Sequence, residues 1–197
     1  MFSFCKRRRG KMGRIFSFLL ILVGLIIIGV SGYEIYKNMV LQENQLVEAH
    51  ELVDNPLGNK DQFSPFTGGT AGILWIPKIE AELPIVEGTD EDDLAKGVGH
   101  YNGTAWPLDN DQIVLSGHRD TVFRRMGELE IGDELVVKVP YGIFTYVIES
   151  TKIVDKDDRT VIKSTAPEEV LTVTTCHPFR YVGNAPNRYI ITAKPVR

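Results

Sequence analysis

The chain has 197 residues, of which 43% are hydrophobic, and a formal net charge of −4 at pH 7, so it can form one folded domain with further segments attached. The charge is divided unevenly: 6 of the 22 basic residues lie in the first 14 positions, and the other 16 lie with all 26 acidic residues in residues 34–197, a formal −10. A domain with this charge is not expected to bind nucleic acid or anionic lipid.

Residues 1–14 form a basic tail, and residues 15–33 contain no charged side chain. The 19 residues of this uncharged segment come close to the roughly 20 that a helix needs to cross about 30 Å of hydrocarbon. The positive-inside rule places the basic tail in the cytoplasm and the chain after residue 33 outside the cell. The pattern therefore predicts a single-pass protein of the cell membrane that contacts lipid through residues 15–33.

A cleavable signal peptide is the alternative for this segment, because Gly29 and Ser31 are small enough to suit a signal peptidase. The apolar region of a signal peptide is shorter, about 7 to 15 residues. The length of the segment therefore favours an uncleaved anchor.

Residues 34–71 are expected to connect the membrane anchor to the domain that follows. Apolar residues at spacings of three, four or seven predict a helix after residue 34. They are Ile35, Met39, Leu46, Ala49 and Val53. The stripe covers fewer than three heptads, which favours a helix that docks on the following domain over a coiled coil. Residues 54–71 are rich in Pro, Gly, Asn and Ser and are typical of a linker.

From residue 72 to residue 197, short β-rich runs alternate with turn residues. The candidate strands are GILWIP, AELPIVEG, QIVLSG, ELVVKV, FTYVIES, TKIVD, VLTVTTC and RYIITAK. The sequence VPYGIF predicts a tight hairpin, and only DTVFRRMGEL predicts a short helix. The pattern indicates a mostly β domain, a small and mainly antiparallel barrel or sandwich with one core.

The two cysteines, Cys5 and Cys176, are separated by the predicted topology, since Cys5 lies on the cytoplasmic side. Cys176 then has no disulfide partner within the chain. A lone exported cysteine indicates an intermolecular disulfide or a reactive thiol. A buried cysteine that packs as a small hydrophobic residue is the alternative.

Cys176 ends the run TVTTC, in which successive side chains face opposite sides of the predicted strand. Cys176 therefore shares a face with Thr172 and Thr174, whereas His177 points to the other face. His177 is next to the thiol in the sequence but is not expected to be its base; a surface or turn position is favoured.

The remaining histidines occur in three different settings. His50 lies in the predicted helix and is expected to be solvated, and His100 lies in the glycine-rich GVGHYNGT, where it is expected to hold the loop. His118 follows the apolar strand QIVLSG, and site residues often project from such strand ends. We therefore expect His118 to be the catalytic partner of Cys176. Asp120 either orients His118 or is an exposed turn residue.

A thiol that attacks an acyl group needs a proton donor for the leaving amine and a positive or hydrogen-bonding group for the oxyanion. If the strands that flank the loop HPFRYVGNAP pair in antiparallel fashion, Cys176 and Arg188 face one another. Arg188 then offers a fixed set of donors to the oxyanion or to the substrate backbone. Arg180 lies inside the loop and is the second candidate, and a solvated surface position is the alternative for both.

Four segments of residues 72–197 resemble the sortases, membrane-anchored cysteine transpeptidases of Gram-positive bacteria. TVTTC is similar to the family's Thr-Leu-x-Thr-Cys signature, with Val173 in place of leucine, and LSGHRD resembles the segment that carries the family's histidine. NRYIITAK supplies the arginine, and GVGHYNGTAWP is similar to the stretch that leads to the histidine strand. The short loop after Cys176 and the sequence YVGNAPNRY most resemble class D.

The resemblance implies a closed eight-stranded sortase-type β-barrel with one or two short helices, preceded by the single transmembrane helix. It implies that Cys176 cuts an LPxTG-like sorting signal after Thr and forms a thioacyl enzyme. An amine, such as the cross-bridge amine of a peptidoglycan precursor, would resolve this intermediate. By the same resemblance His118 is the general acid and base, and Arg188 steadies the oxyanion or the signal peptide.

No cofactor is implied by the resemblance, and no metal ligand is assigned. Some sortases bind calcium, but the sequence contains no compact set of carboxylates that requires it. Two other functions fit the same residues. A membrane-anchored cysteine protease would hydrolyse the thioacyl intermediate, and a non-catalytic β-barrel would bind a cell-wall ligand in the same cleft with Cys176 merely buried.

Overall fold

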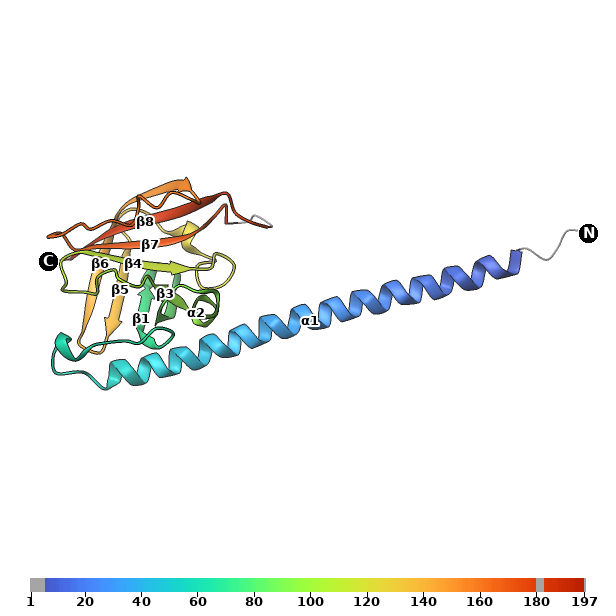
Figure 1. The fold of residues 1–197 in the computed structure, drawn as a ribbon, viewed down its shortest axis with the longest axis horizontal. Coiled ribbons are helices and arrows are strands. Elements are labelled where there is room, and N and C mark those ends of the chain that lie inside the picture. The colour runs from blue at the N-terminus through green and yellow to red at the C-terminus, as the bar shows by residue number, and fades with distance from the viewer. Residues whose placement is uncertain (1–5, 180–182, 197) are drawn as a thin grey trace, which may run out of the picture. The chain divides into compact units, whose positions relative to one another are not determined.

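The structure of the chain, a computed structural model, describes residues 6–179 and 183–196 (Figure 1). The fold divides into two compact units between Val40 and Leu41. The first unit consists of the N-terminal part of α1 (Lys6–Asp54), a helix that runs without a break through the predicted membrane segment and the predicted helix after it. The helix ends two residues before Pro56, because a proline disfavours the helical conformation of the residue that precedes it.

Helix α1 is apolar and exposed over the predicted membrane segment. Its most apolar window has a mean hydropathy of 2.7 and contains no buried side chain. By length and composition, the helix can cross a membrane. The expected boundary after residue 33 is not marked by any interruption of the helix.

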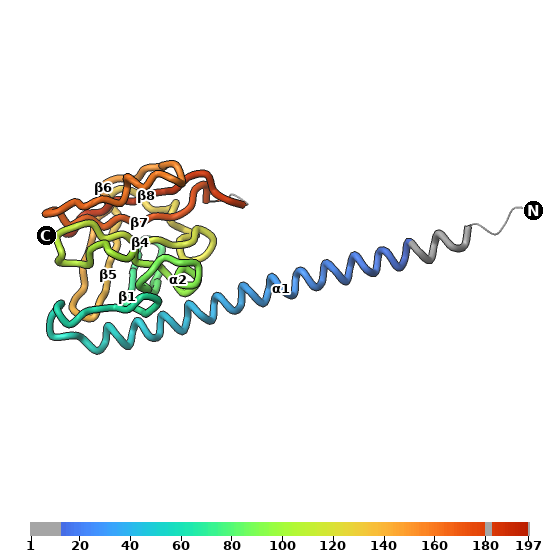
Figure 2. Tube along the Cα trace, viewed as in Figure 1, coloured from blue at the N-terminus to red at the C-terminus, as the bar shows by residue number. Residues whose placement is uncertain are grey.

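The described part of the second unit contains eight β-strands. They are β1 (Thr70–Ile76), β2 (Ala81–Glu87), β3 (Val98–His100), β4 (Gln112–Gly117), β5 (Glu134–Val139), β6 (Gly142–Asp155), β7 (Val170–His177) and β8 (Asn187–Pro195). They form a closed barrel in the order β1-β2-β3-β4-β7-β8-β6-β5. Figure 1 draws the strands as arrows, and Figure 2 traces the path of the chain through them. The pairs β2–β3 and β4–β7 are parallel, and the other pairs are antiparallel.

The closed eight-stranded barrel confirms the predicted fold class, but two strands differ from the expected ones. The runs FTYVIES and TKIVD form the single strand β6, whose pairing with β8 shifts between Ile148 and Ser150. An irregularity of this kind bends a strand without ending it. Strand β3 lies where the sequence predicts a glycine-rich turn around His100, and its three residues are too few to give a clear alternation of apolar and polar positions.

The predicted short helix in DTVFRRMGEL is present only as turns and the 3₁₀ helix η3 (Met126–Glu128). Burial of Phe123, Met126 and Leu129 in the barrel core holds this segment in an irregular path. The short α-helix of the barrel unit is instead α2 (Glu91–Lys96), which the sequence pattern does not indicate. Its three acidic residues in the first turn and its lysine in the last turn suit the helix dipole.

Apolar side chains fill the barrel interior. Leu74, Leu135 and Leu171 are fully buried in it, together with Tyr146. The hydroxyl group of Tyr146 donates to Glu169 Oε1 at 2.7 Å, and burial raises the pKa of this tyrosine. The one polar atom of this large core side chain is therefore hydrogen-bonded, as buried polar groups normally are.

The C-terminal part of α1 packs on the barrel. Ala49 is fully buried, and Gln45 Oε1 accepts a hydrogen bond of 2.8 Å from the hydroxyl group of Thr70. His50, which the sequence predicts to be solvated, is 46% exposed and lies 3.3 Å from a carboxylate oxygen of Glu82. This end of the helix is therefore docked on the domain rather than free in solvent.

The segment that follows α1 crosses the barrel surface. The backbone N–H of Leu57 donates to Pro140 O at 2.8 Å. The ring of Phe63 packs edge-on against Trp106 and Tyr141, with centroid distances of 5.1 and 5.0 Å. The predicted linker is therefore attached to the barrel by an aromatic cluster.

Replacing Leu135 by alanine tests the barrel core. Leu135 is fully buried in β5, which carries none of the candidate site residues, so Leu135→Ala should lower the free energy of unfolding by about 2 to 5 kcal/mol. Chemical denaturation of the full chain in detergent micelles, followed by circular dichroism, would measure this loss. Ile131 is 70% exposed, so Ile131→Ala is the matched control, expected to stay within about 0.5 kcal/mol of the wild type. Equal effects of the two variants would contradict the assigned core.

Candidate active site

Three strands bring the candidate catalytic residues to one edge of the barrel. Strand β4 pairs in parallel with β7, and its last residue, Gly117, lies opposite Thr175. His118 directly follows Gly117. Strands β7 and β8 are antiparallel, and Cys176 lies directly opposite Arg188, as the sequence predicts. The sheet therefore delivers a thiol, an imidazole and a guanidinium from three neighbouring strands.

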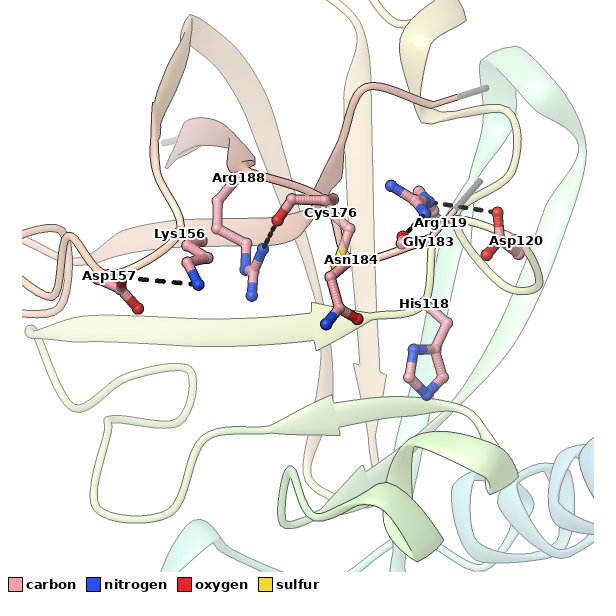
Figure 3. A pocket seen from close by; sticks show the side chains of 10 residues that line it. His118, Arg119, Asp120, Lys156, Asp157, Cys176, Gly183, Asn184 and Arg188 are labelled. Atoms are coloured by element: carbon pink, nitrogen blue, oxygen red, sulfur yellow. Dashed lines mark hydrogen bonds and ion pairs between the residues drawn. The ribbon is translucent and has the colours of Figure 1, made fainter. Parts of the chain in front are cut away.

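These three side chains line the same cleft, which has a volume of about 440 Å³ (Figure 3). The lining residues are His118, Arg119, Asp120, Lys156, Asp157, Cys176, Gly183, Asn184, Ala185 and Arg188. Cys176 is a free cysteine of intermediate exposure. The thiol is therefore in a cleft that a substrate can enter, and not in the apolar core.

The two faces of β7 have separate environments. Leu171 and Val173 belong to the barrel core. Thr172 and Thr174 line a groove on the outer surface, and Cys176 lines the cleft. The alternation predicted for TVTTC is therefore present, and it places the thiol on the outer face.

The backbone around His118 is held by hydrogen bonds. The carbonyl oxygen of His118 accepts bonds from the N–H groups of Thr121 and Phe123, at 3.4 and 3.0 Å. The hydroxyl group of Thr175 donates to Gly117 O at 2.7 Å, which ties β7 to the end of β4. A Cβ atom at Gly117 would lie 2.6 Å from the ring of Phe123, so a glycine fits this close approach. The imidazole thus projects from a well-supported turn.

Arg188 holds the end of the loop that leads into β8. Its Nη1 atom donates to the carbonyl oxygens of Asn187 and Ala185, at 3.1 and 3.5 Å. The side chain is partly buried and lines the cleft. A guanidinium has five N–H donors, so these two bonds leave donors for a substrate oxygen. Arg180, the second candidate, lies outside the described residues.

Arg119 is a site residue that the sequence analysis missed. It is only 7% exposed, and it donates to Pro178 O and Gly183 O at 3.1 and 2.9 Å. Most arginines are exposed unless their charge is paired or hydrogen-bonded. The position of Arg119 directly after a strand-end histidine therefore gave little reason to expect burial. Asp120 is 72% exposed, and its Oδ1 atom lies 3.4 Å from Arg119 Nε. This carboxylate therefore pairs with Arg119, in an exposed position.

His100 has a structural environment. His100 is 1% exposed, with Nδ1 2.7 Å from Glu87 Oε2 and Nε2 3.0 Å from Ala105 O. Its ring stacks on Trp106 at 4.0 Å. These contacts agree with the expectation that His100 holds its loop.

His177 is partly buried in an aromatic cluster. Its ring contacts Phe179 and Tyr189, with centroid distances of 5.4 and 6.1 Å. Both of these rings also pack against the barrel core. His177 therefore belongs to the side of β7 opposite the thiol, although it is packed rather than at the free surface that the sequence suggests.

A second groove adjoins the cleft on the outer face of β4, β7 and β8. It has a volume of about 230 Å³ and shares Lys156 and Arg188 with the cleft. One wall is the connection between β6 and β7, which Asp111 anchors by accepting bonds from Thr165 N and Ser164 Oγ. Bonds from backbone N–H groups, that of Thr165 first, lower the pKa of Asp111. The groove and the cleft therefore adjoin at Lys156 and Arg188.

Within residues 6–179 and 183–196, no group of three or more His, Cys, Asp or Glu side chains is arranged to hold a metal ion.

A β-barrel that carries a cysteine, a histidine and an arginine in one open cleft has the composition of a thiol-dependent enzyme that acts on acyl groups. Comparisons with known proteins agree. A family model described as Sortase domain matches residues 74–196. The chain is 51% identical to Sortase D of Bacillus subtilis (strain 168) over 197 residues, which covers 94% of this chain and all of that protein.

Solved structures give the same result. The structure of a Clostridium perfringens Sortase D5 transpeptidase matches with a TM-score of 0.70 and 26% identity, over 80% of this chain and 99% of that chain. The catalytic domain of B. anthracis SrtD matches with a TM-score of 0.57 and 40% identity, over 72% of this chain and 95% of that domain.

The chain belongs to the sortase family, and its 51% identity to Sortase D makes it a class D homologue. Sortases are cysteine transpeptidases that recognise sorting signals, so this chain is a transpeptidase of that type. The non-catalytic binding barrel considered from the sequence is therefore wrong.

Proposed function

We propose that Cys176 is the nucleophile, His118 the general acid and base, and Arg188 the donor to the oxyanion in this transpeptidase. The supporting observation is that all three side chains line one cleft and come from three adjoining strands. The substrate is an exported protein with an LPxTG-like sorting signal. The acceptor is an amine of a peptidoglycan precursor.

In the first half-reaction, the Cys176 thiolate attacks the carbonyl carbon of the signal's threonine. The carbonyl oxygen becomes an oxyanion, which Arg188 stabilises with guanidinium N–H groups. When the intermediate collapses, the C–N bond breaks, and His118 gives its proton to the departing amine. The products are a thioacyl enzyme on Cys176 and the free C-terminal peptide.

In the second half-reaction, His118 takes a proton from the incoming amine, which attacks the thioester carbonyl. Arg188 again donates hydrogen bonds to the oxyanion. The C–S bond then breaks and returns the thiolate of Cys176, and a new amide bond joins the protein to the acceptor. If water took the place of the amine, the same steps would yield hydrolysis.

The location supports transfer to a cell-wall amine. Helix α1 contains a segment that is apolar and long enough to cross a membrane. The positive-inside rule supports an orientation with residues 1–14 in the cytoplasm and the barrel outside. An enzyme held at the extracellular face of the cell membrane meets exported proteins and lipid-linked precursors at a raised effective concentration.

The reaction itself is tested with the full chain in detergent micelles. Mixed with LPxTx peptides and an excess of candidate amines, it should yield an amide adduct of the N-terminal peptide fragment, identified by mass spectrometry. Cys176→Ala should give neither adduct nor cleavage, because the covalent intermediate requires the thiol. Release of the free acid alone, at every amine concentration, would favour the protease instead.

Replacing His118 by alanine should lower kcat/KM by about 100- to 10,000-fold, because positioned acid–base catalysis typically contributes this much. The fold should be retained, since His118 follows the last residue of β4 and is absent from the core. His50→Ala is the control, as His50 lies on α1, is half exposed and does not line the cleft. Near-normal activity of His118→Ala would remove His118 from the mechanism.

Replacing Arg188 by lysine should lower kcat by about 100-fold or more, although the charge is kept, because lysine lacks the planar set of donors. Arg125→Lys is the matched control. Arg125 is 53% exposed, donates to Ile79 O at 2.8 Å and pairs with Glu128, and it does not line the cleft. Steady-state kinetics of peptide cleavage would compare the two variants. Equal activity of both would leave Arg188 with a structural role only.

A further inference from the structure

Residues 183–185, which precede β8, line the cleft, and among the described residues the side chain of Arg119 joins them to the residues that follow β7. The outgoing limb of the loop between β7 and β8 begins at Pro178, and its returning limb is described from Gly183 to Pro186. Arg119 Nη1 donates to Pro178 O at 3.1 Å, and Arg119 Nη2 donates to Gly183 O at 2.9 Å. One guanidinium therefore bridges the two limbs directly beyond the nucleophile.

The position of Arg119 is set by β4. It follows His118 in the turn at the end of that strand, and its side chain is 7% exposed. A buried, charge-assisted pair of hydrogen bonds from a planar guanidinium fixes direction as well as distance. The loop after the cysteine is thus held by the residue next to the candidate general base.

Arg188 holds the same returning limb from the other end, through Ala185 O and Asn187 O. Between the carbonyl of Gly183, held by Arg119, and that of Ala185, held by Arg188, lies Asn184. This residue is exposed and lines the cleft. In the view of Figure 3, its amide projects between the side chains of Arg188 and His118.

We propose that Arg119 is a positioning residue: it fixes the returning limb of the loop so that the amide of Asn184 contacts the backbone of the bound sorting signal. An amide side chain has both a donor and an acceptor, which suits the C=O and N–H groups of an extended peptide. The proposal rests on the proposed function, because it takes the cleft as the place where the signal is held.

This role differs from support of the fold. Gly183 and Ala185, whose carbonyl oxygens accept bonds from Arg119 and Arg188 on the returning limb, lie outside the strands and outside the apolar core. Loss of Arg119 should therefore loosen the cleft wall and leave the barrel packed. Lysine cannot replace it fully, since one ammonium lacks the fork that reaches two carbonyls in fixed directions.

The test measures kcat and KM for a sorting-signal peptide with the full chain in detergent micelles, well below the melting temperature. We expect Arg119→Gln to raise KM by about tenfold or more with a smaller change in kcat, the pattern of lost substrate binding. Arg119→Lys should fall between Arg119→Gln and the wild type. Asn184→Ala should raise KM to a similar extent without lowering the melting temperature.

A double-mutant cycle decides whether the two residues act together. If Arg119 acts through Asn184, the double variant should be no worse than Arg119→Gln alone, a clear departure from additivity. Additive effects would overturn the proposal, and so would a KM of Arg119→Gln within about twofold of the wild type. Should Arg119→Gln fail to fold, Arg119→Lys completes the same cycle.

Leu135→Ala is the matched control for stability, since it weakens the core on β5, none of whose residues lines the cleft, and it should leave KM unchanged. A KM raised equally in this variant would show that the Arg119 effect is only a loss of stability. The wild type provides the second control. If it forms no amine adduct at all, the proposed function fails, whereas a normal wild type with an unchanged Arg119→Gln rejects the positioning role alone.

Discussion

The register of β7 against its two neighbours is the constraint on which the site depends. Antiparallel pairing with β8 sets Cys176 opposite Arg188, and parallel pairing with β4 sets Gly117 opposite Thr175, so that His118 leaves the sheet at the same edge. Backbone ladders hold Cys176 and Arg188 directly, and strands place side chains more precisely than loops do. A shift of one residue in β7 would turn the cysteine toward the core and Thr175 toward the cleft.

The two faces of β7 have different roles. One face of β7 contributes Leu171 and Val173 to the barrel core, and the other presents Thr172, Thr174 and Cys176 to the groove and cleft. Because the two faces share a backbone, packing of the interior fixes the position of the thiol. Substitutions along the outer face can therefore change the bound peptide without disturbing the interior.

The cleft is locally basic on an acidic domain. Arg119, Lys156 and Arg188 line it together with Asp120 and Asp157, whereas residues 34–197 carry a formal charge of −10. Fixed positive groups in such a cleft stabilise an oxyanion. Both arginines also donate to carbonyl oxygens of the returning limb, Arg119 to Gly183 O and Arg188 to Ala185 O. The residues that supply positive charge to the cleft therefore also help to shape its wall.

The sequence by itself determined the apolar N-terminal helix and a mostly β domain, and it singled out the candidate residues Cys176, His118 and Arg188, because these signals are local: an uncharged run, short β-rich runs and short motifs. The closed eight-stranded barrel was implied only by the resemblance of those motifs to the sortases. The sequence did not reveal β3, helix α2 or the burial of Arg119. Strand β3 has three residues and helix α2 has six, which is too few to show a clear periodicity. The hydrogen-bond partners of Arg119 lie 59 and 64 positions further along the chain. Only the tertiary structure decided which carbonyls that arginine meets, because contacts at such separation arise from strand pairing around the closed barrel and from no pattern near the residue itself.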